Sequence, residues 1–202
     1  MTGRPGWNWI MVMILSTVIG FGSMRYVLGL EMVPPPLRPN FLNHQTGFIV
    51  HIALGTCALL SGPWQFVDLL RQKRPRIHRT LGWIYVLSCT IGGLAGLIIA
   101  GGSNGGPIAA VGFGSLAVLW IAFTSLALVA AIRRRFDAHR RWMIVSFALT
   151  FAGVTLRLYL PLTAIDLTRF SEIYAWIAWA CWVPNLLVGL WLARRTKPVA
   201  WG

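Results

Sequence analysis

Four histidines and one arginine stand in regions of this 202-residue chain where a polar side chain costs free energy. His51, His78 and His139 lie in or beside long apolar runs, and Arg157 lies near the end of another. A neutral imidazole can hold haem iron or accept a proton, and a guanidinium pairs with an anionic oxygen. These residue types predict redox or proton chemistry inside a membrane.

The distances along the chain sort these residues into two layers. His51 lies about 6 Å and Arg157 about 7.5 Å from the same end of their helices at the 1.5 Å rise per residue, so we expect both in one outer layer. His44, two turns or about 10.8 Å before His51, is too far along one helix to share an iron with it. Arg157 has two other possible fates, which are to extend toward water or to pair with Asp166 or Glu172.

The second layer lies at the opposite ends of the helices. His78 and His139 each begin an apolar run at a similar depth, so they could face each other as ligands of one b-type haem. They are metal ligands only if that haem iron is bound, and we expect Gln65 and Asp68 to support them. His51 would then be the ligand of a five-coordinate outer haem or a proton acceptor.

One further polar residue, Asn185, follows Pro184 inside an apolar run. Proline removes a backbone hydrogen bond and kinks a helix. We expect Asn185 to satisfy the freed backbone groups or to line a cavity, whereas Tyr85 and the tryptophans are interpreted as packing residues.

Six apolar runs must position these side chains. The chain is 56% hydrophobic and only 11% charged, and a helix of about 20 apolar residues crosses the hydrocarbon layer. The runs do not alternate as barrel strands do, which predicts helices. Arg4 before the first run also fits a signal peptide, but apolar residues continue to Leu30, so we expect this helix to be retained. The predicted spans are about 9–30, 47–70, 81–101, 108–132, 142–162 and 173–193.

The chain has a net charge of +13, and the basic residues that cause it are unevenly distributed between the two predicted sides of the membrane. Fourteen of the 18 basic residues fall before the first span, after the last, and in the 2–3 and 4–5 connections. The positive-inside rule places these segments, and both termini, in the cytoplasm. The basic excess is therefore a topology signal, and we expect no nucleic-acid partner.

Several reaction classes lack their motifs. The sequence contains no C-x-x-C-H, no H-E-x-x-H, no Walker A loop and no G-x-S-x-G. No Asp or Glu lies near the centre of a span, which argues against a proton pump or a cation-coupled carrier.

Six short motifs resemble a bacterial family of membrane proteins, the domain-of-unknown-function family 2306. They are His51-x-x-x-Gly55, Gly62-Pro63-Trp64-Gln65-Phe66, His78-Arg79-x-x-Gly82-x-x-Tyr85-Val86, His139-Arg140-Arg141-Trp142-Met143, Leu156-Arg157-Leu158 and Trp182-x-x-Asn185. Trp83 stands where a basic residue is expected. The resemblance implies a multi-span protein of the bacterial inner membrane and implies no particular activity.

Together these observations predict one all-α domain over residues 1–202. We expect an integral membrane bundle of six helices with both termini in the cytoplasm. The leading functional hypothesis is electron transfer with haem b or a quinone, using His51, His78, His139 and Arg157. The alternatives are a non-catalytic subunit of a larger membrane complex and a carrier of small molecules or lipids.

Overall fold

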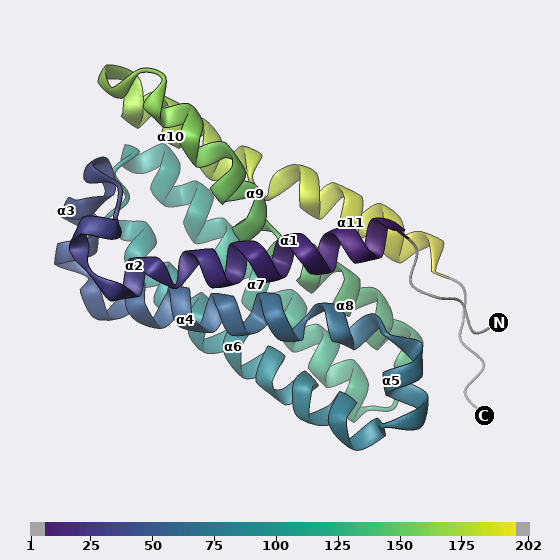
Figure 1. Ribbon diagram of the computed structural model, residues 1–202. Coiled ribbons are helices and arrows are strands. Elements are labelled where there is room, and N and C mark those ends of the chain that lie inside the picture. Colours follow the sequence, from purple (N-terminus) through teal and green to yellow (C-terminus); the bar gives the residue numbers. More distant parts are fainter. Residues whose placement is uncertain (1–6, 197–202) are drawn as a thin grey trace.

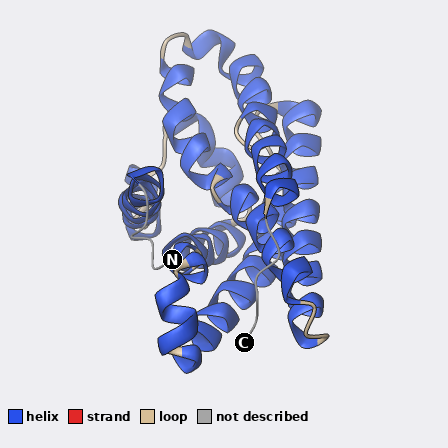
Figure 2. Cartoon of the chain, turned by 90° about the vertical axis from the view of Figure 1, so that its right-hand side faces the viewer, coloured by secondary structure: helices blue, strands red, loops and turns tan. Residues whose placement is uncertain are grey.

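The computed structural model describes residues 7–196, and every regular element in that range is helical (Figure 2). Six segments in it are long and apolar enough to cross a membrane, which confirms the prediction of six apolar helices. They are Trp7–Leu28, Gln45–Phe66, Pro75–Gly101, Gly106–Ile132, Phe136–Ala164 and Leu167–Arg195.

Several of these segments are built from more than one helix. The α-helices are α1 (Trp7–Ser23), α2 (Arg25–Leu28), α3 (Arg38–Asn43), α4 (Gln45–Ser61), α5 (Asp68–Lys73), α6 (Pro75–Gly101), α7 (Gly106–Ile132), α8 (Phe136–Thr150), α9 (Ala152–Tyr159), α10 (Phe170–Ala180) and α11 (Val183–Arg195). Short 3-10 helices are η1 (Leu30–Met32), η2 (Pro35–Leu37), η3 (Pro63–Phe66), η4 (Leu160–Ala164) and η5 (Leu167–Arg169).

Four helices form the centre of the bundle. α4 packs against α6, α6 against α7, and α7 against α8. The others cover this centre: α1 lies on α4 and α9, α10 on α7, and α11 on α8 (Figure 1). His51, His78 and His139 lie on the central helices α4, α6 and α8. Arg157 lies on α9, which follows α8 in the same candidate span.

Glycines on α6 allow its neighbours to approach closely. A Cβ atom at Gly93 would lie 2.6 Å from Ile121 of α7, and one at Gly92 would lie 3.3 Å from Leu54 of α4. Helices in lipid associate mainly through such close packing. Lipid tails are as apolar as the helix surfaces, so the hydrophobic effect does not drive the helices together. Gly92 and Gly93 therefore allow α4 and α7 to pack closely against α6.

Two of the candidate spans are interrupted close to a proline. α4 ends before Pro63, which starts η3, and the last span breaks at Cys181–Trp182 before Pro184. Asn185 Nδ2 donates to the Cys181 carbonyl at 3.1 Å and to Thr155 Oγ1 at 2.8 Å. The last span is interrupted before Pro184 as expected. Asn185 binds the Cys181 carbonyl at this break, next to the Ala180 carbonyl that Pro184 leaves without an N–H donor.

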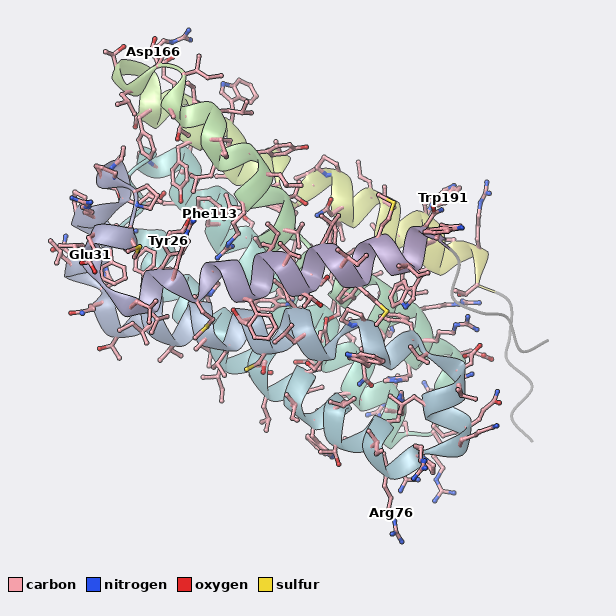
Figure 3. All side chains as sticks on the ribbon, in the orientation of Figure 1. Tyr26, Glu31, Arg76, Phe113, Asp166 and Trp191 are labelled. Carbon is pink, nitrogen blue, oxygen red and sulfur yellow. The ribbon has the colours of Figure 1, made fainter. Side chains whose placement is uncertain are left out.

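The basic connections gather at one end of the bundle. α5, the start of α8 and the end of α11 lie together in Figure 1, and Glu31 and Asp166 lie at the other end in Figure 3. The turn into α8 passes through Arg134, at φ 56° the one non-glycine residue of the described range with positive φ. The amides of Arg134 and Arg135 bond to Ala131 and Ala130, as at a Schellman helix end.

The cytoplasmic placement of these basic turns remains a prediction that cysteine labelling can test. We expect a membrane-impermeant maleimide to label Glu31→Cys on intact cells or spheroplasts, and Arg74→Cys only after lysis, since both positions lie outside the candidate spans. The unsubstituted chain is the control, since its three cysteines all lie within candidate spans. Labelling of Arg74→Cys on intact cells would reverse the predicted orientation.

Candidate functional site

A cavity of about 180 Å³ opens between the central helices in the half of the bundle away from the basic turns, and we call it the outer cavity. α1, α4, α6, α7, α8 and α9 all contribute to its wall, and η2, α3 and the segment around Pro34 contribute on the outer side. Most of the lining is aliphatic or aromatic. Both His51 and Arg157 line it, so the structure brings these two residues together at one level of the bundle.

The His51 ring is held in one orientation by α6. Its Nδ1 lies 2.8 Å from the carbonyl oxygen of Gly92. A carbonyl only accepts, so Nδ1 carries the proton and donates it, and the neutral ring presents Nε2 as an acceptor. Gly96 makes room for the ring, because a Cβ atom there would lie 3.1 Å from Nδ1. Trp120 meets the ring edge-on, with 6.5 Å between ring centroids.

Arg157 carries a positive charge into the same cavity. Its Nη1 donates to the Gly153 carbonyl of its own helix at 3.1 Å, and its Nε is buried with no partner among the described residues. Tyr26 and Tyr174 line the cavity with it. Within residues 7–196, no carboxylate forms an ion pair with this guanidinium.

Of the alternatives considered for Arg157, the pairing with Asp166 or Glu172 does not occur. Glu172 accepts from Arg169 at 3.0 Å, three residues away on the same exposed turn. Asp166 accepts from the Thr168 hydroxyl at 2.6 Å, which lowers the pKa of the Asp166 carboxyl. Each acid has a partner close in sequence, and neither reaches the cavity.

Below the cavity lies a network of buried hydroxyl groups. Tyr85 Oη bonds to Thr150 Oγ1 at 2.8 Å and to Ser146 Oγ at 2.9 Å. Thr124 Oγ1 lies 2.7 Å from Ser146 Oγ, and Trp120 Nε1 donates to Thr150 Oγ1 at 2.9 Å. The network joins α6, α7 and α8 and gives Trp120 and Thr150 fixed positions on the cavity wall.

Tyr85 and Trp120 were interpreted from sequence as packing residues, and this network shows that they also make directed contacts. The spacing of His78 and Tyr85, seven residues apart, offered one signal. Seven residues is close to two helical turns and places both side chains on one face of α6.

His44 and Asn40 form the outer edge of the site. Asn40 lines the cavity and donates from Nδ2 to the Ile99 carbonyl at 3.0 Å. His44 Nδ1 lies 2.9 Å from Asn40 Oδ1, so its role is to orient Asn40. His44 does not continue α4 toward His51, because α4 begins after it at Gln45.

The inner polar residues lie at the other end of the same central helices. His139 Nδ1 donates to the Ala127 carbonyl at 2.8 Å, and His78 lies close enough to His139 for the two to interact electrostatically. Gln65 lies against Gly82 of α6, while Asp68 pairs with Arg71 at 2.8 Å. The structure therefore brings His78 and His139 to one level, and it turns Asp68 toward the basic turn.

No group of three or more His, Cys, Asp or Glu side chains that could hold a metal ion occurs within residues 7–196. The inner pair, His78 and His139, offers two imidazole groups and no third ligand of these types from the described part of the chain. The outer cavity supplies one imidazole and one guanidinium.

The comparisons with known proteins identify a family. The family model described as Predicted membrane protein (DUF2306) matches residues 48–193, a range that includes both polar layers. The comparison with curated proteins found no match, and neither did the comparison with solved structures.

The unpaired charge of Arg157 predicts an unusual effect on stability. We expect Arg157→Met to raise the melting temperature of the protein by a few degrees, measured in detergent after washing has removed any bound ligand. Burying a charge without a partner costs free energy, and methionine fills similar space without that cost. Intrinsic fluorescence during heating measures this shift.

Arg169→Met is the matched control for this prediction. Its exposed ion pair with Glu172 contributes little, so we expect a change within about 0.5 kcal/mol. A melting temperature lowered by Arg157→Met would show instead that the guanidinium supports the fold.

Proposed function

The chain belongs to the family described as Predicted membrane protein (DUF2306), and we propose that its outer cavity binds the ring of a membrane-soluble quinone or quinol. The single observation that carries the proposal is that one cavity holds an imidazole acceptor and an unpaired guanidinium donor. The setting we propose is the inner membrane of a bacterium.

The two polar groups favour a ligand that both donates and accepts. A quinol hydroxyl donates to His51 Nε2, and a second ring oxygen accepts from Arg157. A fatty-acid carboxylate satisfies Arg157 alone, because it has no proton to donate to a neutral imidazole. The pairing therefore favours a quinol over a simple anionic amphiphile.

The size of the cavity supports the same ligand class. An engineered apolar cavity of about 150 Å³ holds one benzene molecule, and the outer cavity measures about 180 Å³. A single substituted ring fits this volume, whereas a haem macrocycle does not. We therefore do not assign an outer haem to His51.

The same two residues supply the chemistry of quinol oxidation. Each quinol that becomes a quinone loses two electrons and two protons. His51 Nε2 accepts one proton from the hydroxyl it binds, and the other proton leaves toward the outer aqueous side. Arg157 binds the second ring oxygen and stabilises the negative charge that forms there as this other proton leaves, and the two electrons pass one at a time to a one-electron acceptor such as a haem.

Binding of decylubiquinone tests the proposal directly. The protein is placed in lipid nanodiscs, and quenching of its tryptophan fluorescence is titrated, since Trp120 lines the cavity. We expect Arg157→Gln and His51→Phe each to weaken binding by about tenfold or more. A hydrogen bond to a charged group contributes about 1.5–3 kcal/mol, and 1.4 kcal/mol corresponds to a factor of ten.

Arg169→Gln serves as the control, because it removes a positive charge at the same end of the bundle outside the cavity. It should bind decylubiquinone like the unsubstituted protein. Palmitate is titrated in parallel, and tighter binding of palmitate than of decylubiquinone would replace the quinone proposal with a carrier of carboxylate lipids.

A b-type haem between His78 and His139 is the second candidate, favoured by the orientation of His139. Its Nδ1 donates to Ala127, so Nε2 is available as a ligand, the arrangement in which a backbone carbonyl orients a metal-binding imidazole. The haem would supply one-electron transfer at the inner side of the bundle.

Reduced-minus-oxidised absorption spectra of protein expressed with added haem test this second candidate. We expect a b-type band that His139→Ala removes and that His51→Ala leaves intact. The lack of any band in the unsubstituted protein would exclude the inner haem and leave the quinone proposal to its own binding test.

A further inference from the structure

An open groove of about 770 Å³ lies between α8 and α11 at the basic end of the bundle. Four arginines line it: Arg134 and Arg135 from the turn before α8, Arg141 from α8 and Arg194 from α11. These residues come from two parts of the chain about 50 positions apart, so the packing of α11 on α8 creates the cluster.

The charge in this groove exceeds what its acid can balance. Asp137, which has a partner of its own, is the one acid among the lining residues. Four guanidiniums therefore face one carboxylate. The positive-inside rule explains why basic residues lie on this side of the membrane, but it does not require them to gather around one groove.

Apolar side chains continue the groove toward the membrane interior. Val145 of α8 and Leu190 of α11 line it, together with the aromatic ring of Trp142. Tryptophan favours the level of lipid headgroups. A ligand that suits these walls carries negative oxygens at the arginines and hydrocarbon along α8 and α11.

We propose that this groove binds an anionic phospholipid, with its headgroup phosphate among Arg134, Arg141 and Arg194 and an acyl chain between α8 and α11. Guanidinium groups bind phosphate oxygens through paired N–H donors. Basic pockets between membrane helices on the cytoplasmic side commonly hold headgroups of this kind. The groove is separate from the outer cavity, so the site does not depend on the quinone proposal.

The start of α8 adds to the attraction. α8 has 15 residues and begins at Phe136 beside the groove, and helix N-termini carry partial positive charge. The left-handed conformation of Arg134 turns the chain sharply there, so the basic turn and the first turn of α8 lie together.

Thermal unfolding of the detergent-purified full chain tests the site. Cardiolipin, phosphatidylcholine with the same acyl chains, and inorganic phosphate are each added at matched phosphate concentration. We expect cardiolipin to raise the melting temperature by several degrees, because a ligand that binds the folded state stabilises it. Phosphatidylcholine and inorganic phosphate should produce much smaller shifts.

Variants distinguish this groove from general charge attraction. We expect Arg141→Gln with Arg194→Gln to weaken cardiolipin binding by about thirty-fold, since each basic side chain near an anionic surface contributes roughly a factor of five. Arg74→Gln with Arg76→Gln removes the same charge from the other basic turn, where Arg76 points away from the bundle (Figure 3). This control should keep the full shift.

Lysine replacements guard against a folding defect. Arg141→Lys with Arg194→Lys keeps the charge and should retain part of the stabilisation by cardiolipin. Native mass spectrometry of the purified protein should also find anionic lipid on the unsubstituted chain and less of it on the glutamine variant. An equal loss in the Arg74/Arg76 control, or an equal shift with phosphatidylcholine or inorganic phosphate, would overturn the proposal.

Discussion

The structure depends on one constraint, which is that polar groups within the hydrocarbon layer must find partners inside the protein. Helices satisfy the backbone, and the side chains follow the same rule at the centre of the bundle. Tyr85 satisfies its hydroxyl with Ser146 and Thr150, and Thr150 also accepts from Trp120. These bonds join α6, α7 and α8 in the interior of the bundle. They also fix the positions of Trp120 and Thr150, which line the cavity.

The residues of the proposed quinone site are those that meet this rule only in part. His51 satisfies Nδ1 through Gly92, which leaves Nε2 as its acceptor, and the residue lines the cavity. Arg157 satisfies one nitrogen through Gly153 and brings a charge that no carboxylate of the described residues pairs with. A protein that retains such a charge gives up some stability, and a bound ligand with a suitable oxygen restores it. The fold and the proposed function thus both depend on whether buried polar groups have partners within the protein.

Much of the fold could be predicted from the sequence, because apolar length and charge placement are local properties. The six spans, the kink before Pro184 and the shared layer of His51 and Arg157 follow from counting residues along helices. The partner of Arg157 could not be predicted in this way. Asp166 and Glu172 looked available by position, but each bonds within its own exposed turn, to Thr168 and Arg169 respectively. Short-range partners compete better because they require no extended side chain to cross the site.

By itself the sequence determined the membrane class, the six helices and the sorting of basic residues to one side, since these depend on hydrophobic length and on charge counts. Only the tertiary structure decided which faces of the helices meet. That choice made Tyr85 the centre of a hydroxyl network, left Nε2 of His51 as the acceptor, and closed α8 and α11 around the arginine groove. The physical reason is that α7, the most apolar of these segments, shows no one-sided polar pattern in its sequence. Its rotation is set by contacts that exist only when the helices pack, namely the fit of Ile121 against Gly93 and the hydrogen bonds of Trp120 and Thr124 to α8.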